Sequence, residues 1–308
     1  MEDLTNKSKS PDYYRELIFK NRFDKEMVNL VRSIKDRIDI KWDCVAVIDG
    51  EEGVGKTTLA IVMAYLLDDK FDLDRNIAYL PTTSEVEEKF HEIDTKQVLI
   101  IDEAIKALYK LRFMDKMQSR INTMYATERK QRKITFLCIP RFTDLNEFFR
   151  NDRIQFWIHV VDRGLAVAFV KDKVNIFGSD RWHMKEEYKK ICLATHKKRF
   201  SEMGTEEAVK IYEKSQHFWF AFRFPELPEE VEDRYLELRE QYHIKTRTVI
   251  GNDRTDITKR LLLAKEAWNL KLDNEQIARI AGVTIRSIDR IKSEIRNTRK
   301  LEEAAKTL

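Results

Sequence analysis

The spacing of apolar residues changes along the chain. Between residues 12 and 38 apolar positions recur every three or four residues, which predicts one or two amphipathic helices. From residue 44 onward, short apolar runs alternate with helical stretches, and we expect these runs to be strands. The expected strands cover 44–49, 76–80, 97–102, 134–139, 154–161 and 165–170, with an edge strand at 174–177. Strands that alternate with helices predict an α/β fold with a mainly parallel sheet, covered on both faces.

The strand-like runs end at Gly178, and residues 181–245 have a helical, charged and aromatic pattern. Within them the aromatic run at 217–224 is interpreted as core or interdomain contact rather than as a base-stacking platform. A last helical segment begins near Thr255. The changes of pattern predict N-terminal helices over 1–40, a core over 41–180, a helical linker region over 181–250 and a C-terminal domain over 251–308.

Composition narrows the class of protein. Apolar residues make up 43% of the 308 residues, enough to bury a core and to exclude wholesale disorder. No apolar run approaches the roughly 18 residues that span a bilayer, and the first residues lack the apolar stretch of a secretory signal. We therefore expect a cytoplasmic protein without a membrane span. The chain has three cysteines, Cys44, Cys138 and Cys192, which are far apart in the sequence. This spacing favours a role as inert packing residues over a disulfide framework or a metal site.

The small net charge of +4 is unevenly distributed. Residues 254–300 contain 12 Lys and Arg against 6 Asp and Glu, which leaves the rest of the chain with a net charge of −2. Because the basic excess is confined to one segment, it favours a nucleic-acid contact there.

A glycine-rich motif follows the first expected strand. Residues 50–57 read GEEGVGKT and match the phosphate-binding pattern G-x-x-x-x-G-K-[ST] in full. Glycines let backbone N–H groups turn inward around phosphate oxygens, and the next helix adds its positive dipole end. Lys56 is expected to reach the β- and γ-phosphates and Thr57 to bind Mg²⁺. The expected nucleotide-binding residues are Gly50, Gly53, Val54, Gly55, Lys56, Thr57 and Thr58.

Two carboxylates end the third expected strand, VLIIDE at 98–103. We expect Asp102 to hold Mg²⁺ together with Thr57, as a Walker B aspartate does. Glu103 is expected to polarise an attacking water, so that Lys56 and Glu103 are the candidate catalytic residues. The alternative is that both carboxylates are solvated and cap the following helix.

This order of motifs resembles the additional-strand, catalytic-glutamate division of P-loop ATPases, which includes the RecA, AAA+ and FtsK–HerA groups. The resemblance implies a RecA-like core with strand order 5-1-4-3-2, flanked here by all-α N-terminal and C-terminal extensions. It also implies that the chain is an ATP hydrolase with ATP and Mg²⁺ as its cofactors.

The stretch 129–152 resembles the FtsK–HerA and Zot-like pattern. In those families a polar residue, often Gln, ends a strand and senses the γ-phosphate. Here Pro140 occupies that place, so either Arg141 serves as the sensor or the chain belongs to another subgroup. Such ATPases commonly form rings, which implies a homo-oligomeric ring such as a hexamer, in which an arginine of a neighbour completes the site. The candidates are Arg129, Arg132, Arg141, Arg150 and Arg153.

The basic C-terminal segment resembles a trihelical helix-turn-helix of the sigma-factor and resolvase types. Asp273 and Thr284 are expected to cap two helices, and Gly282 suits the tight turn between them. The second helix is expected to enter the major groove of DNA. Its expected DNA-binding residues are Thr284, Arg286, Ser287, Arg290 and Lys292. The alternative is a helical bundle used for oligomerisation or partner docking.

Three functions follow from these interpretations. The first is a DNA-dependent ATPase that couples hydrolysis to DNA translocation, packaging or remodelling. The resemblance suggests that it belongs to a mobile element or a virus, and for a viral protein the expected location is the host cell cytoplasm. The second is an ATP-switched, site-specific DNA-binding protein, such as a replication initiator, partition factor or regulatory factor. The third is an ATP-dependent scaffold with a helical docking tail, which predicts no DNA binding at low salt.

Overall fold

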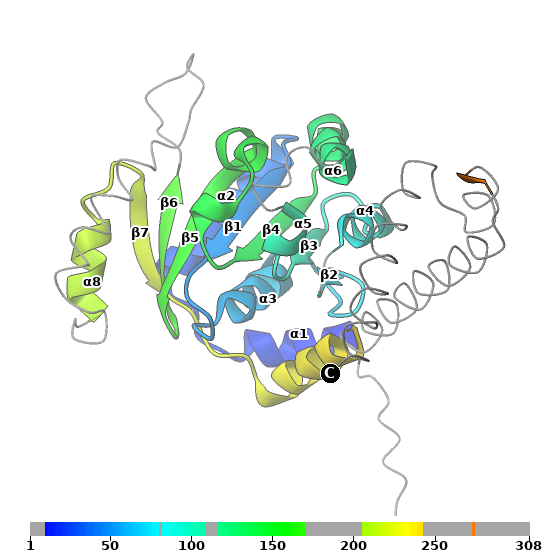
Figure 1. Ribbon diagram of the computed structural model, residues 1–308. Coiled ribbons are helices and arrows are strands. Elements are labelled where there is room, and N and C mark those ends of the chain that lie inside the picture. Colours follow the sequence, from blue (N-terminus) through cyan, green and yellow to red (C-terminus); the bar gives the residue numbers. More distant parts are fainter. Residues whose placement is uncertain (1–9, 80–81, 109–115, 171–204, 243–272, 275–308) are drawn as a thin grey trace, which may run out of the picture. The chain divides into compact units, whose positions relative to one another are not determined.

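The computed structural model describes residues 10–79, 82–108, 116–170, 205–242 and 273–274 (Figure 1). The chain divides into two compact units, Met1–Tyr242 and His243–Leu308. The expected helix-turn-helix falls outside the described residues except for Asp273 and Asn274. Within the described part of the chain, no helix has the length and apolar character to cross a bilayer.

A seven-stranded sheet forms the centre of the first unit, in the order β2-β3-β4-β1-β5-β6-β7. The strands from β2 to β5 pair in parallel, and β6 and β7 extend the sheet in antiparallel pairing. The parallel part has the order 5-1-4-3-2 that the sequence predicts, and the unit has the RecA-like P-loop NTPase fold. The strands are β1 (Cys44–Asp49), β2 (Ile77–Ala78), β3 (Val98–Ile101), β4 (Ile134–Ile139), β5 (Ile154–Asp162), β6 (Leu165–Val170) and β7 (Phe218–Arg223).

The last strand corrects the expectation that strands end at Gly178. Phe218–Arg223 pairs with β6, where Leu165 lies opposite Arg223. The run is apolar at nearly every position, and periodicity alone does not distinguish such a run in a strand from one in a buried helix. Its interpretation as core is confirmed, since Phe222 is buried and Trp219 packs against the same cluster.

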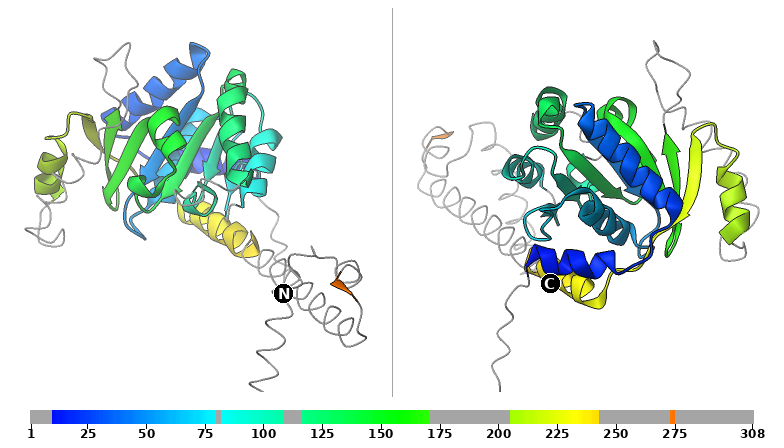
Figure 2. Two further views of the ribbon diagram at one scale, coloured as in Figure 1. Left: turned by 45° about the horizontal axis from the view of Figure 1, so that its top comes forward. Right: turned by 180° about the vertical axis from the view of Figure 1, so that it is seen from behind.

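Helices cover both faces of this sheet (Figures 1 and 2). Strand β1 divides the core between them, because Ala46 and Ile48 pack on one face and Val45 and Val47 on the other. The first face carries α1 (Pro11–Phe19), α2 (Lys25–Asp39), α3 (Lys56–Leu67) and the helical residues 229–242. The second carries α4 (Thr83–Glu92), α5 (Ile105–Leu108), α6 (Lys116–Thr127) and α8 (Thr205–Tyr212).

Helix α3 is apolar on every side, and it is buried continuously from Leu59 to Tyr65. An amphipathic helix packs one apolar face on a sheet and exposes its polar face to water. Helix α3 has no such polar face, so other elements must cover the side that points away from the sheet. Helices α1 and α2 both contact α3 and supply that cover. The helix that carries Lys56 and Thr57 in its first turn is therefore held rigidly.

The sequence of residues 143–151 favours one short helix, but the structure has two separate turns there. These are the 3₁₀ turn η3 (Phe142–Asp144) and the π-helical turn η4 (Phe149–Arg153). The Asn146 side chain accepts the backbone N–H of Phe149 at 3.0 Å, and Asp49 accepts that of Phe142 at 2.9 Å. The Asn146 contact caps the start of the second turn, and the Asp49 contact holds the first turn apart from it, which explains the difference.

Two of the three cysteines are described, and both match the expected packing role. Cys44 and Cys138 are free thiols buried in β1 and β4. Burial raises the pKa of Cys44 to about 12, so its thiol stays protonated and unreactive at neutral pH.

Candidate nucleotide-binding site

The glycine-rich loop lies at the carboxyl end of β1 and leads directly into α3. At Gly50 a Cβ would approach the backbone oxygen of Val160 in β5 to 2.6 Å, so no side chain fits there. Gly53 has φ +78°, which L side chains rarely adopt, and a Cβ there would meet nothing within 4 Å. The loop is thus pressed against the sheet at its start and borders open space at Gly53.

Lys56 opens α3 and turns its side chain back over the loop. Its Nζ donates to the backbone oxygens of Gly50 at 3.0 Å and Glu51 at 2.5 Å. Charged phosphate oxygens are stronger acceptors for an ammonium group than neutral carbonyls are. The Lys56 ammonium is therefore held where phosphate oxygens can replace its present partners. Val54 and Thr58, also expected to bind nucleotide, flank it and are half-buried.

Thr57 and Asp102 meet although 45 residues separate them. Thr57 Oγ1 donates to Asp102 Oδ1 at 2.9 Å, and Asp102 is only 4% exposed. Strand β4 lies between β1 and β3, so the first turn of α3 and the end of β3 reach the same edge of the sheet. A hydroxyl and a carboxylate are oxygen ligands of the kind that Mg²⁺ prefers, so the residues present fit this ion.

Glu103 follows Asp102 in an unusual backbone conformation, with φ +50°. Its N–H donates to Asp102 Oδ1 at 3.2 Å, and its side chain is 34% exposed. A non-glycine residue in the left-handed region costs on the order of 1 kcal/mol and persists only when its surroundings impose it. The strained residue of this turn is the candidate base.

Two residues that the sequence analysis missed contact this acidic pair. Both come from the helical residues 229–242. The Tyr235 hydroxyl donates to Asp102 Oδ2 at 2.7 Å, and Arg239 Nη2 donates to Glu103 Oε1 at 2.9 Å. Burial, together with the Asp102 carboxylate, raises the pKa of Tyr235, so the phenol stays a proton donor. The sequence shows the four-residue spacing that puts Tyr235 and Arg239 on one helical face, but it does not show that this face contacts the acidic pair.

Asp49 is a further residue that the sequence analysis treated only as part of a strand. It ends β1, immediately before the loop, and is 4% exposed. Its carboxylate accepts from Trp157 Nε1 at 2.7 Å and from the Phe142 N–H at 2.9 Å, and it lies 2.8 Å from His159 Nδ1. These contacts join β1 to β5 and to the turn after β4, and thereby fix the start of the loop.

The arginines that are candidates to act on a neighbouring subunit differ in their exposure and in their distance from the loop. Pro140 and Arg141 follow β4, and the Gly50 N–H donates to Pro140 O at 3.4 Å, so this turn adjoins the loop. The Arg141 side chain is exposed. Arg153 is excluded as an arginine that acts on a neighbour, because it is 2% exposed and ion-paired with Asp43. Among the others Arg129 is exposed, and Arg132 and Arg150 are half-buried.

The candidate DNA-binding residues lie outside the described part of the chain. They are Thr284, Arg286, Ser287, Arg290 and Lys292. Their roles stay predictions from the sequence.

No protein-family model matches this chain, and no curated protein matches it either. Among solved structures it is similar to the N-terminal domain of zonular occludens toxin from Neisseria meningitidis, with 13% identity, 62% of this chain and 98% of that chain covered, and a TM-score of 0.35. It is also similar to the genome packaging NTPase of Sulfolobus turreted icosahedral virus 2, with 12% identity, 42% of this chain and 92% of that chain covered, and a TM-score of 0.30. A third similar structure is a RuvB mutant from Thermotoga maritima, with 14% identity, 65% of this chain and 73% of that chain covered, and a TM-score of 0.34. At values this low, the likenesses carry no argument about activity.

Proposed function

We propose that the chain binds ATP with Mg²⁺ in the glycine-rich loop and hydrolyses the nucleotide. The observation that carries this proposal is the 2.9 Å hydrogen bond between Thr57 Oγ1 and Asp102 Oδ1, beside the Lys56 ammonium group inside the loop. Phosphate, metal and water each require a different group, and the required groups come together at one edge of the sheet.

The residues divide the proposed work among them. Backbone N–H groups of the loop and Lys56 bind the phosphates and orient the terminal one. Thr57 and Asp102 would hold Mg²⁺, which supplies positive charge beside the reacting phosphate oxygens. Glu103 accepts a hydrogen bond from the attacking water and takes up its proton.

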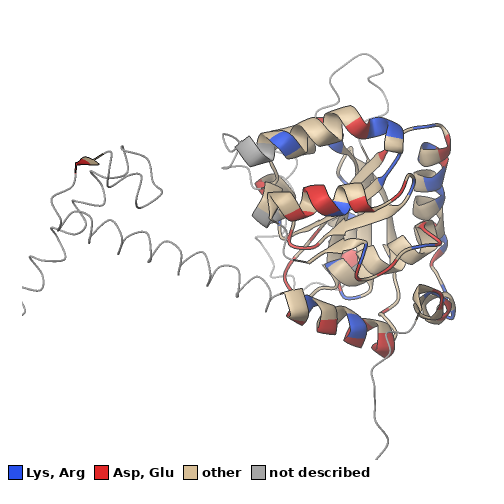
Figure 3. Cartoon of the chain, turned by 90° about the vertical axis from the view of Figure 1, so that its right-hand side faces the viewer, with Lys and Arg blue, Asp and Glu red and all other residues tan. Residues whose placement is uncertain are grey.

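We infer that DNA is the partner and that the C-terminal segment contacts it, as the FtsK–HerA-like and helix-turn-helix patterns imply. The basic excess of residues 254–300 supports this assignment. In the face of the molecule drawn in Figure 3, acidic and basic positions are interspersed over the described helices, as in an ordinary solvated surface. The proposed activity is thus a DNA-dependent ATPase, with roles in DNA translocation, packaging or remodelling.

We also propose a homo-oligomer in which Arg141 acts on the nucleotide of a neighbour. Its side chain is exposed and therefore accessible to a neighbouring subunit, which supports this role. An arginine supplied by a second subunit makes hydrolysis depend on assembly, so a dilute protein is expected to be slow.

The second candidate is an ATP-switched, site-specific DNA-binding protein. The ion pair between Arg239 and Glu103 favours it, because a base that is engaged by a cation gives slow turnover. A switch holds its nucleotide for long periods and binds one DNA sequence, whereas a motor turns over rapidly on any sequence.

The test is the ATPase rate with and without duplex and single-stranded DNA, alongside the mass of the protein with and without nucleotide. A DNA-dependent ATPase is stimulated many-fold by DNA of arbitrary sequence. A switch shows little stimulation and protects one site in a footprint. Absence of hydrolysis under all these conditions contradicts the proposed activity.

A further inference from the structure

The helix formed by residues 229–242 contacts both carboxylates of the candidate site. Tyr235 binds Asp102, and Arg239 binds Glu103, from successive turns of the same helical face. One element therefore touches the proposed metal-binding residue and the proposed base at the same time.

The position of this helix is fixed by the core. Val231 and Leu238 are buried in the same cluster as α1 and α3, with exposed fractions of 0% and 2%. The Tyr13 hydroxyl of α1 donates to Glu230 Oε2 at 2.6 Å, and the two helices lie side by side (Figures 1 and 2). Its contacts with the acidic pair thus belong to the packed structure of the first unit.

The contact made by Arg239 opposes the chemistry that Glu103 is proposed to perform. A base that activates water needs a carboxylate oxygen that the water can reach, and the Arg239 guanidinium occupies Oε1 of Glu103 at 2.9 Å. The pair is also incomplete, because Arg239 Nε is buried without a hydrogen-bond partner among the described residues. A partly satisfied contact on a strained residue is suited to opening.

We propose that Arg239 is a positioning residue that holds Glu103 in a resting ion pair, and that hydrolysis requires this pair to open. The inference rests on the proposed function and adds its regulation. Tyr242 is the last residue of the first unit, so the chain passes from this helix directly into His243–Leu308. A partner bound by that unit can act on the last turn of this helix, which carries Arg239, and so release Glu103.

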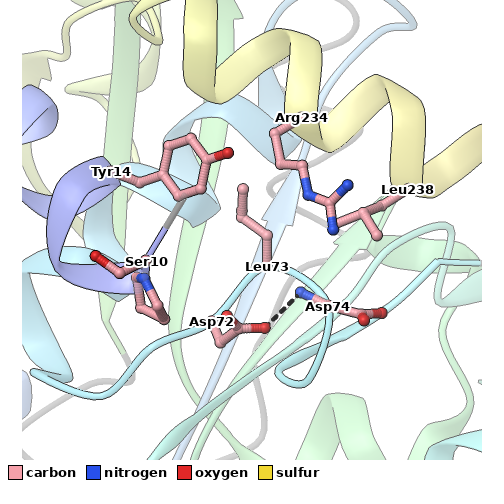
Figure 4. A pocket seen from close by; sticks show the side chains of 8 residues that line it. Ser10, Tyr14, Asp72, Leu73, Asp74, Arg234 and Leu238 are labelled. Carbon is pink, nitrogen blue, oxygen red and sulfur yellow. Dashed lines mark hydrogen bonds between the residues drawn. The ribbon is translucent and has the colours of Figure 1, made fainter. Parts of the chain in front are cut away.

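Arg234 provides a matched control on the same helix. It pairs with Glu237 at 2.7 Å and projects, with Leu238, into a pocket that Asp72 and Asp74 border (Figure 4). Arg234→Gln therefore removes an arginine from the same helix without altering the acidic pair. Arg239→Lys keeps the charge of the resting pair and is a second, conservative variant.

The experiment measures kcat, KM and the affinity for Mg²⁺ with a non-hydrolysable ATP analogue in the full chain. For Arg239→Gln we expect kcat to rise about two- to fivefold, the factor that a half-exposed ion pair can supply, with KM and affinity within about twofold of the parent. Arg239→Lys is expected to lie between the two, and Arg234→Gln to match the parent.

Amide hydrogen exchange of residues 229–242 supplies a readout that does not depend on turnover. Arg239→Gln is expected to show faster exchange than the parent, because the contact that ties this helix to Glu103 is lost. A lower kcat in Arg239→Gln, or exchange that the substitution leaves unchanged, overturns the resting pair. If the parent binds the analogue but never hydrolyses ATP, the proposed function fails, and the exchange measurement still decides whether Arg239 restrains the helix.

Discussion

Thr57 Oγ1 and Asp102 Oδ1 lie 2.9 Å apart, although β4 separates the strands that lead to them. The hydroxyl comes from the first turn of a helix that is buried from Leu59 to Tyr65, and the carboxylate follows the end of a buried strand. Because both supports are rigid, the pair is preorganised for a cation that needs oxygen ligands at fixed positions.

Replacing Glu103 by Gln tests its role as the base. We expect Glu103→Gln to bind ATP with nearly the affinity of the parent and to lose at least about 100-fold in kcat, because an amide takes up no proton from water. Steady-state hydrolysis and calorimetric binding measure the two effects. Glu88→Gln, at an exposed position of α4, is the control. Parental kcat in Glu103→Gln would assign proton transfer to another group.

Removing the hydroxyl of Tyr235 tests its support of Asp102. Tyr235→Phe deletes the donor at 2.7 Å from Oδ2. Since loss of such an outer contact typically weakens a metal site about tenfold or more, we expect the Mg²⁺ concentration for half-maximal ATPase rate to rise by about that factor. Tyr242→Phe, on the same helix but bonded to Asp74, is the control. An unchanged Mg²⁺ dependence would reduce Tyr235 to a packing residue.

Asp49 is predicted to matter for stability as well as for the loop. Asp49→Ala leaves Trp157 Nε1 and the Phe142 N–H without their acceptor in a buried position. Hydrogen bonds to a charged group contribute roughly 1.5–3 kcal/mol, so we expect the free energy of unfolding to fall by about 3 kcal/mol in urea denaturation. Asp39→Ala, whose partner Lys96 is an exposed side chain, should cost less than about 1 kcal/mol. Equal losses in the two variants would argue against the buried cluster.

Deletion of residues 255–308 tests where DNA is bound. We expect DNA affinity and its dependence on salt to fall, because the basic excess of 254–300 is removed, while the basal ATPase rate stays within about twofold. Fluorescence anisotropy with a labelled duplex at several salt concentrations measures both quantities. Unchanged affinity and an unchanged salt slope would move the DNA contact to the first unit.

The sequence predicts those parts of the site that are local in the chain. Lys56 and Thr57 belong to one eight-residue motif, and Asp102 and Glu103 end one apolar run, so each pair is recognisable without knowledge of the fold. The strand order was available only as what the family resemblance of these motifs implies. The glycine-rich loop and the strand end are predictable because residues close in the chain determine their backbone geometry.

The contacts that sequence reasoning missed join distant segments. Tyr235 lies 133 residues from Asp102, and Arg239 lies 136 residues from Glu103. Strand β7 was missed because pairing with β6 decides its conformation, and Arg153 was misjudged because the sequence does not reveal burial. Tertiary packing determines each of these features, and no local pattern encodes it.

The most direct measurement is calorimetric binding of Mg²⁺ and a non-hydrolysable ATP analogue to the parent, to Lys56→Ala and to Lys35→Ala, whose lysine is exposed on α2. We expect one nucleotide per chain in the parent and in Lys35→Ala, and at least about 100-fold weaker binding in Lys56→Ala, since its ammonium group is lost from the loop. Absence of binding in the parent at concentrations that allow assembly, or undiminished affinity in Lys56→Ala, would contradict a triphosphate site in this loop.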